Sequence, residues 1–277
     1  MIYKDELREV HKISMEILCD VIELCKKHNL KYFAIAGTAL GTVKYKGFIP
    51  WDDDIDIGML REDYNKFIEI AKKELPKKLF LQNFHTEYDT PFYYSKIRNK
   101  ETKFIEKYYD KLNINKGIFI DIFPIDNIPD NKILQNIQYI KSKIISNIFI
   151  STSISEISSN NKSSKYMIKK LIRKFMNKIF KNANKEKIFY MLEKELTKYN
   201  KKKTKRIGRV NENEIIKINY IYPLKQLEFE GIKINVPGNY HEYLKNRFGD
   251  YMKTPKEEDK RNHNPLKIKV NGVEYDY

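Results

Sequence analysis

The sequence predicts a mixed α/β or α+β core that is interrupted by a helical insert. Residues 5–28 carry apolar side chains at the three- and four-residue spacing of an amphipathic helix. Residues 32–122 alternate short apolar runs with further helical patterns, which is the mixture expected of a sheet flanked by helices. Residues 131–206 are rich in Ile, Lys, Asn and Ser and poor in Gly and Pro. We therefore expect a core over 1–130, a Lys-rich helical insert over 131–206, and a C-terminal section over 207–277 that completes the core.

The elements of the core follow from local signals. Asn29 ends the opening helix, and Tyr32 to Ala36 has the pattern of a short buried strand. Gly37 breaks that strand, and Thr38 is the expected N-cap of a short helix that runs through Tyr45. Further along we expect a turn over 47–50, strands over 54–59, 79–83, 92–98, 102–105 and 118–122, and a helix over 62–74.

The insert and the C-terminal section differ in the secondary structure that their sequences predict. In the insert we expect helices on both sides of a Ser/Asn-rich break over 151–164. The C-terminal section regains strand and turn signals over 227–236 and carries a short helical pattern near 240–248. No internal repeat is visible along the chain.

The net charge of +16 is concentrated in one segment. Residues 162–206 contain 17 Lys and Arg against 3 Glu, and this excess of +14 leaves only +2 for the rest of the chain. A field this strong can draw the segment to phosphates or to an anionic bilayer. A solvated, Lys-heavy helical insert gives the same composition.

Part of this segment has the pattern of an interfacial amphipathic helix, and we expect peripheral contact with an anionic membrane. A helix that faces the core and has a solvated basic back gives the same pattern. The basic residues are Lys169, Lys170, Arg173, Lys174 and Lys178, and the apolar residues at helical spacing are Met167, Ile168, Leu171, Ile172, Phe175, Met176, Ile179 and Phe180.

Several absences point to a cytoplasmic protein. Cys19 and Cys25 are the two cysteines, and their spacing on one expected helix fits neither a disulfide framework nor a zinc site. Residues 1–9 are charged and lack the apolar run of a signal peptide. No stretch approaches the roughly 20 apolar residues that a membrane-spanning helix needs.

Three aspartates carry the strongest chemical signal. Asp54 and Asp56 are two residues apart in an expected strand, so their carboxylates should project from one face. Like charges this close repel each other unless a cation lies between them. Asp121, between Ile120 and Ile122, is a third carboxylate in an apolar frame. Hard oxygen ligands on rigid strands suit Mg²⁺ or Mn²⁺.

The order of these residues resembles the nucleotidyltransferase superfamily, and longer strings resemble its LicD family. The superfamily order is a Gly-Thr turn at Gly37 and Thr38, then Asp54-Ile55-Asp56, then a strand Asp at Asp121. Ala36 stands where the LicD family usually has a second glycine, and Lys44 stands where arginine is common. The LicD-like strings are residues 36–44, 47–58, 96–98, 117–124 and 240–252, followed by Arg261 and His263.

The resemblance implies a nucleotidyltransferase-like mixed sheet core and a metal-dependent transferase. Asp54, Asp56 and Asp121 would be the catalytic metal ligands, and Gly37 and Thr38 would hold donor phosphates at a helix N-terminus. Members of the family transfer phosphocholine to cell-surface glycans and teichoic acids. The implied donor is therefore a CDP-activated alcohol such as CDP-choline, the released product is CMP, and the acceptor is a lipopolysaccharide, teichoic acid or capsule precursor, often linked to a lipid.

Further residues are candidates for donor binding. A diphosphate needs cations beyond the metals, and Arg98 shares the strand face of Lys96 by alternation. Trp51 could form an aromatic wall for a quaternary ammonium group, and Arg261 and His263 could close the site. Asp52 would lie on the face of Asp54, with Asp53 pointing away. The cation candidates are Lys44, Lys46, Lys96 and Arg98.

Two other functions stay open from the sequence. An NTP-using nucleotidyltransferase acting on a small molecule, a protein or RNA would share the fold and the acids. A basic nucleic-acid-binding protein without catalysis would share the charge, but three acids at one site repel phosphates unless metals intervene. We therefore do not expect a nucleic-acid partner.

Overall fold

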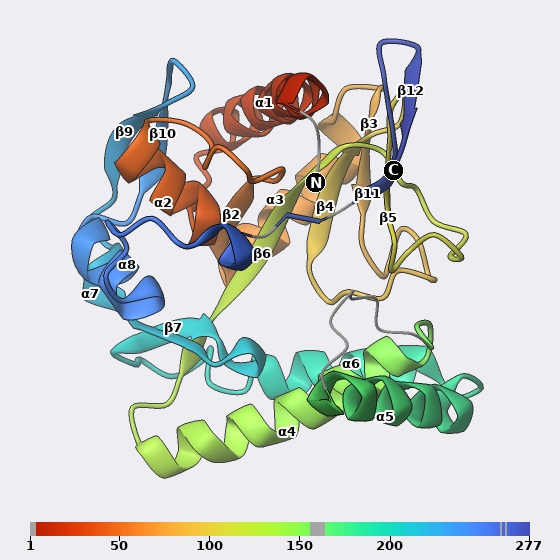
Figure 1. Ribbon diagram of the computed structural model, residues 1–277. Coiled ribbons are helices and arrows are strands. Elements are labelled where there is room, and N and C mark those ends of the chain that lie inside the picture. The colour runs from red at the N-terminus through yellow and green to blue at the C-terminus, as the bar shows by residue number, and fades with distance from the viewer. Residues whose placement is uncertain (1–3, 156–163, 261, 264) are drawn as a thin grey trace.

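The computed structural model describes residues 4–155, 164–260, 262–263 and 265–277. It shows a curled mixed sheet flanked by helices (Figure 1), which confirms the fold class expected from the sequence. The main sheet has the order β1-β2-β6-β4-β3, and β7 and β8 extend it from β6. Its strands are β1 (Phe33–Ala34), β2 (Asp56–Leu60), β3 (Leu79–Gln82), β4 (Ser95–Asn99), β6 (Phe119–Ile128), β7 (Arg206–Arg209) and β8 (Glu214–Lys217).

Two long helices cover one face of this sheet. α1 (Lys4–Lys27) and α3 (Arg61–Glu74) pack on β2, β4 and β6 and on each other. The apolar stripe of α1 is buried because its members recur every three or four residues. Asn29, whose φ is 52°, turns the chain out of the helix, as expected for a residue that tolerates the left-handed region.

The strand register separates an apolar face from a polar face. β2 and β6 run parallel and pair Asp56 with Asp121, and β4 pairs Lys96 with Asp121 from the other side. Directly paired residues share a face of the sheet. These charged residues therefore lie together, and the intervening isoleucines face the helices. The buried isoleucines are Ile55, Ile57, Ile97, Ile120 and Ile122.

Strand β6 is longer than the expected strand over 118–122. It runs from Phe119 to Ile128, and Pro124 lies inside it. Pro124 falls between the last pair with β4 and the first pair with β7, where β6 pairs only with β2. A residue without an N–H is tolerated there because one edge of the strand needs no donor.

The predicted N-cap of the second helix is wrong. α2 spans Ala36–Tyr45 and has Ile35 at its N-cap position, so Thr38 lies within the first turn. The Thr38 hydroxyl is occupied elsewhere, because its Oγ1 accepts a hydrogen bond of 2.7 Å from the backbone N–H of Asp56. Capping by a threonine requires that same oxygen.

Three helices form a lobe beneath the sheet, which we call the helical lobe (Figure 1). It consists of α4 (Lys132–Ser151), α5 (Ser164–Phe180) and α6 (Lys185–Leu196). Residues 156–163 of the expected Ser/Asn-rich break lie outside the described residues. The lobe leaves the sheet after β6 and returns to it through β7. The three-part division of the chain stays a prediction.

Apart from β5, the remaining elements belong to the C-terminal section. The helix expected near 240–248 is present as α8, and the strand signal over 227–236 is a hairpin of β9 and β10. Strands β7, β8, β11 and β12 were not expected. None of the described helices combines the length and apolar character that crossing a bilayer requires. These elements are β5 (Lys103–Glu106), α7 (Ile218–Ile221), β9 (Lys225–Phe229), β10 (Ile232–Val236), α8 (Tyr240–Phe248), β11 (Pro265–Val270) and β12 (Val273–Asp276), with short 3₁₀ turns at Val210–Glu212 and Glu257–Asp259.

Candidate active site

The three aspartates singled out in the sequence converge on the polar face of the sheet. Asp56 and Asp121 are paired across β2 and β6, and Asp54 lies two residues before β2 rather than inside it. Each of the three contributes a carboxylate oxygen, and these oxygens all lie within 4.8 Å of one another. The group formed by Asp54, Asp56 and Asp121, which we call the acidic group, can therefore hold a metal ion.

The electrostatics of the acidic group favour a bound cation. Burial, followed by repulsion from neighbouring carboxylates, raises the pKa of Asp54 and of Asp56 well above the ordinary value. The same two causes raise the pKa of Asp52 to about 7. Charged carboxylates in this setting are costly unless a cation neutralises them. An all-oxygen donor set of this kind fits Mg²⁺ or Mn²⁺.

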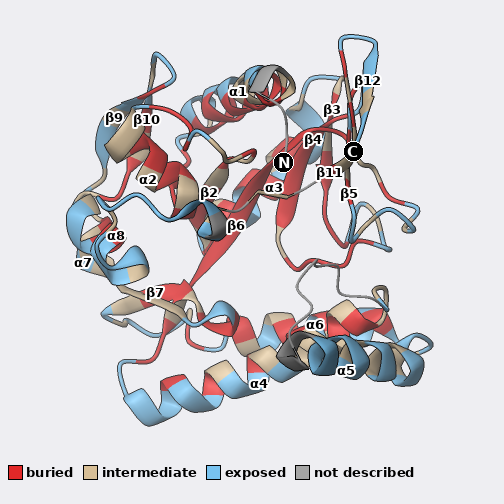
Figure 2. Ribbon diagram, viewed as in Figure 1, coloured by how far each residue is buried: buried red, intermediate tan, exposed pale blue. Residues whose placement is uncertain are grey.

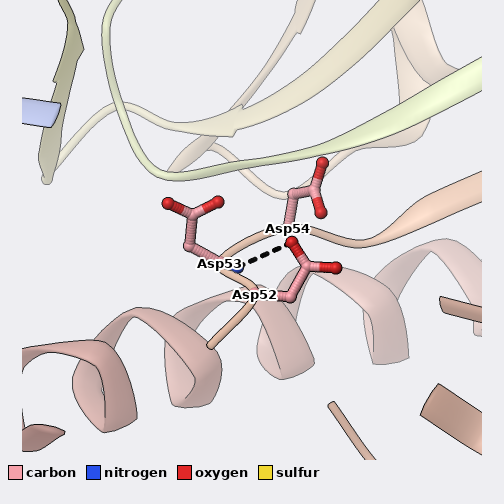
Figure 3. A group of neighbouring side chains, drawn as sticks. All are labelled: Asp52, Asp53 and Asp54. Carbon is pink, nitrogen blue, oxygen red and sulfur yellow. Dashed lines mark hydrogen bonds between the residues drawn. The ribbon is translucent and has the colours of Figure 1, made fainter. Parts of the chain in front are cut away.

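The segment that carries Asp52 is held against α2. Figure 3 shows Asp52, Asp53 and Asp54 side by side, with an Oδ1 of Asp52 accepting a 3.2 Å hydrogen bond from the N–H of Asp53. A Cβ at Gly37 would come within 2.6 Å of the other Asp52 oxygen. Any larger residue at position 37 would therefore displace the Asp52 carboxylate. His11 adds a further tether, because its Nε2 lies 2.7 Å from the carbonyl oxygen of Asp52.

The start of α2 is fixed to both ends of the site. Thr38 accepts from the backbone of Asp56, as described above. The N–H of Ala36 donates to the hydroxyl of Tyr243 on α8 over 2.9 Å. Ala36 itself has φ of 48°, in the region where glycine is preferred. No side chain caps α2, so the N–H groups of Gly37 and Thr38, which follow Ala36, are available to an anion.

Asp53 faces a different partner from its neighbours. It accepts hydrogen bonds from the backbone N–H of His263 at 3.0 Å and from the ring Nδ1 at 2.7 Å. The other ring nitrogen of His263 lies 3.8 Å from carboxylate oxygens of both Asp54 and Glu106. Burial lowers the pKa of His263, but the surrounding carboxylates, led by Asp53, outweigh it and raise that pKa well above the ordinary value. His263 thus joins the C-terminal section to the acidic group.

Lys96 and Arg98 share one face of β4 but have different surroundings. The ammonium of Lys96 lies 2.8 Å from Oδ1 of Asp121 and 3.4 Å from the ring centroid of Phe119. The guanidinium of Arg98 donates to the carbonyl oxygen of Gly117 at 2.7 Å and to Gln82. Both side chains are 1% exposed. The structure therefore brings Lys96 to the acidic group and engages Arg98 inside the protein.

The other expected donor ligands lie at more exposed positions. The ammonium of Lys44 lies 3.4 Å from the Thr254 hydroxyl, and Lys46 is exposed at the end of α2. The ring of Trp51 lies 4.4 Å from the ammonium of Lys260. Arg261 lies outside the described residues.

Two charged residues near the acidic group escaped the sequence reasoning. Glu106 at the end of β5 is 4% exposed and lies 3.6 Å from Arg98. The strand expected over 102–105 ends one residue before Glu106, and the alternation of Glu106 with the apolar Phe104 is the signal that would have found it. Arg209 on β7 stacks 4.1 Å from the ring of Phe123 and is held by Glu214 at 2.6 Å. Its positive charge lowers the pKa of Asp56 and so offsets part of the increase that burial causes. Arg209 was missed because β7 lies next to the Lys-rich segment and was not predicted.

Known proteins resemble the chain over stretches that range from under a fifth of its length to most of it. Residues 29–150 match the family model described as LicD/FKTN/FKRP, nucleotidyltransferase domain. The lipopolysaccharide cholinephosphotransferase LicD of Haemophilus influenzae is 30% identical over 265 residues, which cover 93% of this chain and 95% of that protein. Uncharacterized proteins of Rickettsia typhi and Rickettsia prowazekii are 46% and 48% identical, over 20% and 17% of this chain.

Proposed function

The chain belongs to the LicD family and is a transferase, and from this premise we propose that it transfers phosphocholine from a CDP-linked donor to a hydroxyl group of a cell-surface glycan precursor. The observation that carries the proposal is the convergence of the acidic group, with its oxygens within 4.8 Å of one another, beside the uncapped start of α2. Phosphocholine is the head group named for the H. influenzae relative, which aligns with 93% of this chain. A lipopolysaccharide precursor is the first acceptor to test, and teichoic acid and capsule precursors come next.

The proposed reaction is a displacement at phosphorus. The acceptor oxygen forms a bond to the phosphorus that carries choline, and the bond from that phosphorus to the bridging oxygen of CMP breaks. Asp121 takes the proton of the acceptor hydroxyl, and CMP leaves. A divalent cation bound by Asp54, Asp56 and Asp121 would neutralise charge on the donor phosphates. Most of the acceleration would come from positioning and from charge neutralisation.

The surrounding residues have distinct proposed tasks. The N–H groups at the start of α2, including that of Gly37, would hold donor phosphate oxygens. Lys96 fixes the orientation of Asp121 through their ion pair. Arg209, beside Phe123, supplies positive charge on the side of Asp56. Thr38 keeps Asp56 in register with the helix.

The test is release of CMP from CDP-choline by the purified full-length chain with a lipopolysaccharide-type acceptor. Parallel reactions should contain CDP-ethanolamine, CDP-glycerol, CDP-ribitol and the four NTPs, each with Mg²⁺, with Mn²⁺ or with a chelator. We expect choline transfer that requires the metal and the acceptor. Metal-dependent pyrophosphate release from an NTP, without use of any CDP-alcohol, would instead assign the chain to the NTP-using alternative. Family membership excludes the alternative of a non-catalytic nucleic-acid-binding protein.

A further inference from the structure

Helix α5 is held against the protein mainly by two polar side chains. The guanidinium of Arg173 donates to the carbonyl oxygen of Asn147 at 3.0 Å and to the hydroxyl of Ser151 at 2.7 Å, both on α4. Asn177, four residues further along α5, donates to the carbonyl oxygen of Ser151 at 2.8 Å. Residues four apart lie on one side of a helix. The side of α5 that contacts α4 therefore carries these two polar side chains, and the half-buried Met176 and Phe180 share that side.

The apolar side of α5 faces away from the protein. Leu171 and Phe175 are each 65% exposed. At about 100° per residue they lie roughly opposite Arg173 on the helix. This differs from the usual arrangement, in which an amphipathic helix buries its whole apolar stripe. Figure 2 shows α5 exposed along most of its length. The outward apolar set, each more than half exposed, is Met167, Ile168, Leu171, Ile172, Phe175 and Ile179.

Basic side chains border this apolar face, and acids are absent from both α4 and α5. Lys170, Lys174 and Lys178 follow at four-residue spacing and so form one stripe along α5. Neither α4 nor α5 contains an Asp or Glu. Four isoleucines of α4 lie on the same side of that helix as Asn147, which contacts α5. They precede Asn147 at three- and four-residue spacing. These isoleucines are exposed, and they are Ile133, Ile137, Ile140 and Ile144.

We propose that the outward face of α5 binds the surface of an anionic bilayer. Exposed Leu, Ile and Phe beside a lysine stripe suit the boundary between lipid headgroups and acyl chains. A second copy of the chain fits this face poorly, because it would bring its own lysine stripe against the first. The inference does not depend on the proposed reaction, and the Asp54→Ala protein should bind vesicles as the wild type does.

The test of the apolar contribution is cosedimentation of the full-length chain with vesicles. One set should contain phosphatidylglycerol and phosphatidylcholine, and the other phosphatidylcholine alone. We expect binding to the anionic set and little to the neutral set. Leu171→Ser with Phe175→Ser should weaken partitioning about tenfold or more. Val273→Ser, at a half-exposed residue of the β11–β12 hairpin, is the matched control and should change nothing.

The charge contribution needs its own variants. Each lysine near an anionic surface is worth roughly a fivefold factor in partitioning, so changing Lys170, Lys174 and Lys178 to Glu together should weaken binding on the order of 100-fold. The charge-matched control changes the exposed residues Lys73, Lys77 and Lys100 to Glu, and should weaken binding much less. Raising the salt concentration should release the wild type.

Two results would overturn the proposal. One is failure of the wild type to bind anionic vesicles at low salt. The other is a stable dimer in light scattering that Leu171→Ser with Phe175→Ser converts to monomer, since a second copy would then cover α5. Circular dichroism and thermal melting of each variant establish that the fold is retained, as expected for substitutions at exposed positions.

Discussion

Asp54 and Asp56 illustrate the conflict between function and stability at the scale of single residues. Burial and mutual repulsion raise the pKa of both carboxyl groups, so each destabilises the metal-free fold when charged. We predict that Asp54→Ala or Asp56→Ala abolishes choline transfer and leaves the metal-free protein at least as stable as the wild type. CMP release and thermal melting in chelator measure the two effects. Asp250→Ala, at an exposed acid, is the control. Near wild-type turnover of either variant at saturating Mg²⁺ would refute the assignment of these residues as ligands.

Asp121 should behave differently, because it has a buried counter-ion. Its ion pair with Lys96 measures 2.8 Å, and both side chains are almost fully buried. Asp121→Asn leaves an ammonium group buried without a charge partner, which should cost about 3–5 kcal/mol of stability. Turnover should also fall on the order of 100-fold or more, since the proposed metal ligand and proton acceptor is lost.

A double variant separates the two roles of Asp121. Asp121→Asn with Lys96→Met removes both charges, so stability should recover towards the wild-type value while activity stays lost. Urea unfolding and CMP release measure these outcomes. If the double variant were as unstable as Asp121→Asn alone, the ion pair would not explain the stability of this site.

Ala36 offers the reverse case, in which a substitution should stabilise. Its φ of 48° costs an L-residue about 1–2 kcal/mol, and glycine avoids that cost. Glycine also gives the unfolded chain more conformational entropy, which offsets about 0.4–1 kcal/mol of that stabilisation. We predict that Ala36→Gly leaves stability unchanged or raises it by up to about 1 kcal/mol. The control, Ala39→Gly, lies within α2 and should be destabilising by about 1 kcal/mol. A clear loss of stability in Ala36→Gly would show that the conformation of residue 36 is not strained.

At the scale of elements, the junction between α6 and the core contains a titrating lysine. The Lys185 ammonium donates to the carbonyl oxygen of Tyr88 at 2.8 Å and to the Ser153 hydroxyl at 2.7 Å. Burial lowers the pKa of Lys185 to about 8, against the opposing charge of Asp89. Since the unfolded value is about 10.4, the unfolded chain binds more protons between these two pH values. Stability contributed by this group should therefore rise as the pH increases from about 8 to 10.

The prediction is a difference in pH slope between variants. In the wild type, Lys185 should raise the free energy of unfolding by up to about 3 kcal/mol between pH 8 and 10.5. Lys185→Met should lack this increase. Lys187→Met, two residues away and exposed, should keep the wild-type slope. Urea unfolding across this pH range measures both. Identical slopes for Lys185→Met and the wild type would contradict the lowered pKa.

The sequence predicts an element well when its signal is local. The opening helix and the helix over 240–248 have strong apolar periodicity, and both are present close to the expected ends. β7 and β8 are four residues each and exist because they pair with β6 and with each other. Such short strands carry little alternation, and the partner that joins them to the sheet, β6, lies far away in the chain. The sequence could not identify them for that reason.

The same distinction applies to the site. Asp54, Asp56 and Asp121 sit in recognisable strings, and the structure brings them together. The proximity of Arg209 to Asp56, by contrast, arises only when β7 pairs with β6. The burial of Arg98 also follows from tertiary contacts and not from its neighbours in sequence.

At the scale of the whole molecule, one arginine connects the core to the helical lobe. Arg61 on α3 pairs with Asp126 of β6 at 2.6 Å and with Glu193 of α6 at 3.1 Å. Asp126 is 4% exposed, so removing its cation leaves a buried charge. We predict that Arg61→Met destabilises the protein by about 3–5 kcal/mol.

Hydrogen exchange locates this effect within the molecule. In Arg61→Met, amides of α6 should lose protection more than those of α1. Helix α6 carries Glu193, a partner of Arg61, whereas the main contacts of α1 are with α3, β4, β6 and β11. Lys66→Met is the control, because its pairing with Glu62 is exposed and should contribute little to stability. Equal loss of protection in α1 and α6 would show that Arg61 does not act at the junction.

The contacts that complete the site join residues separated by most of the chain, and this fixes when activity can begin. Ala36 meets Tyr243 across 207 positions, and Asp53 meets His263 across 210. Closing loops this long is slow, and during synthesis it must wait for the distal residues to leave the ribosome. A nascent chain that has emerged through β6 already holds all three acids of the proposed metal site but lacks both of these contacts. The growing polypeptide should therefore stay catalytically silent until translation is almost finished, so unfinished chains do not consume donor.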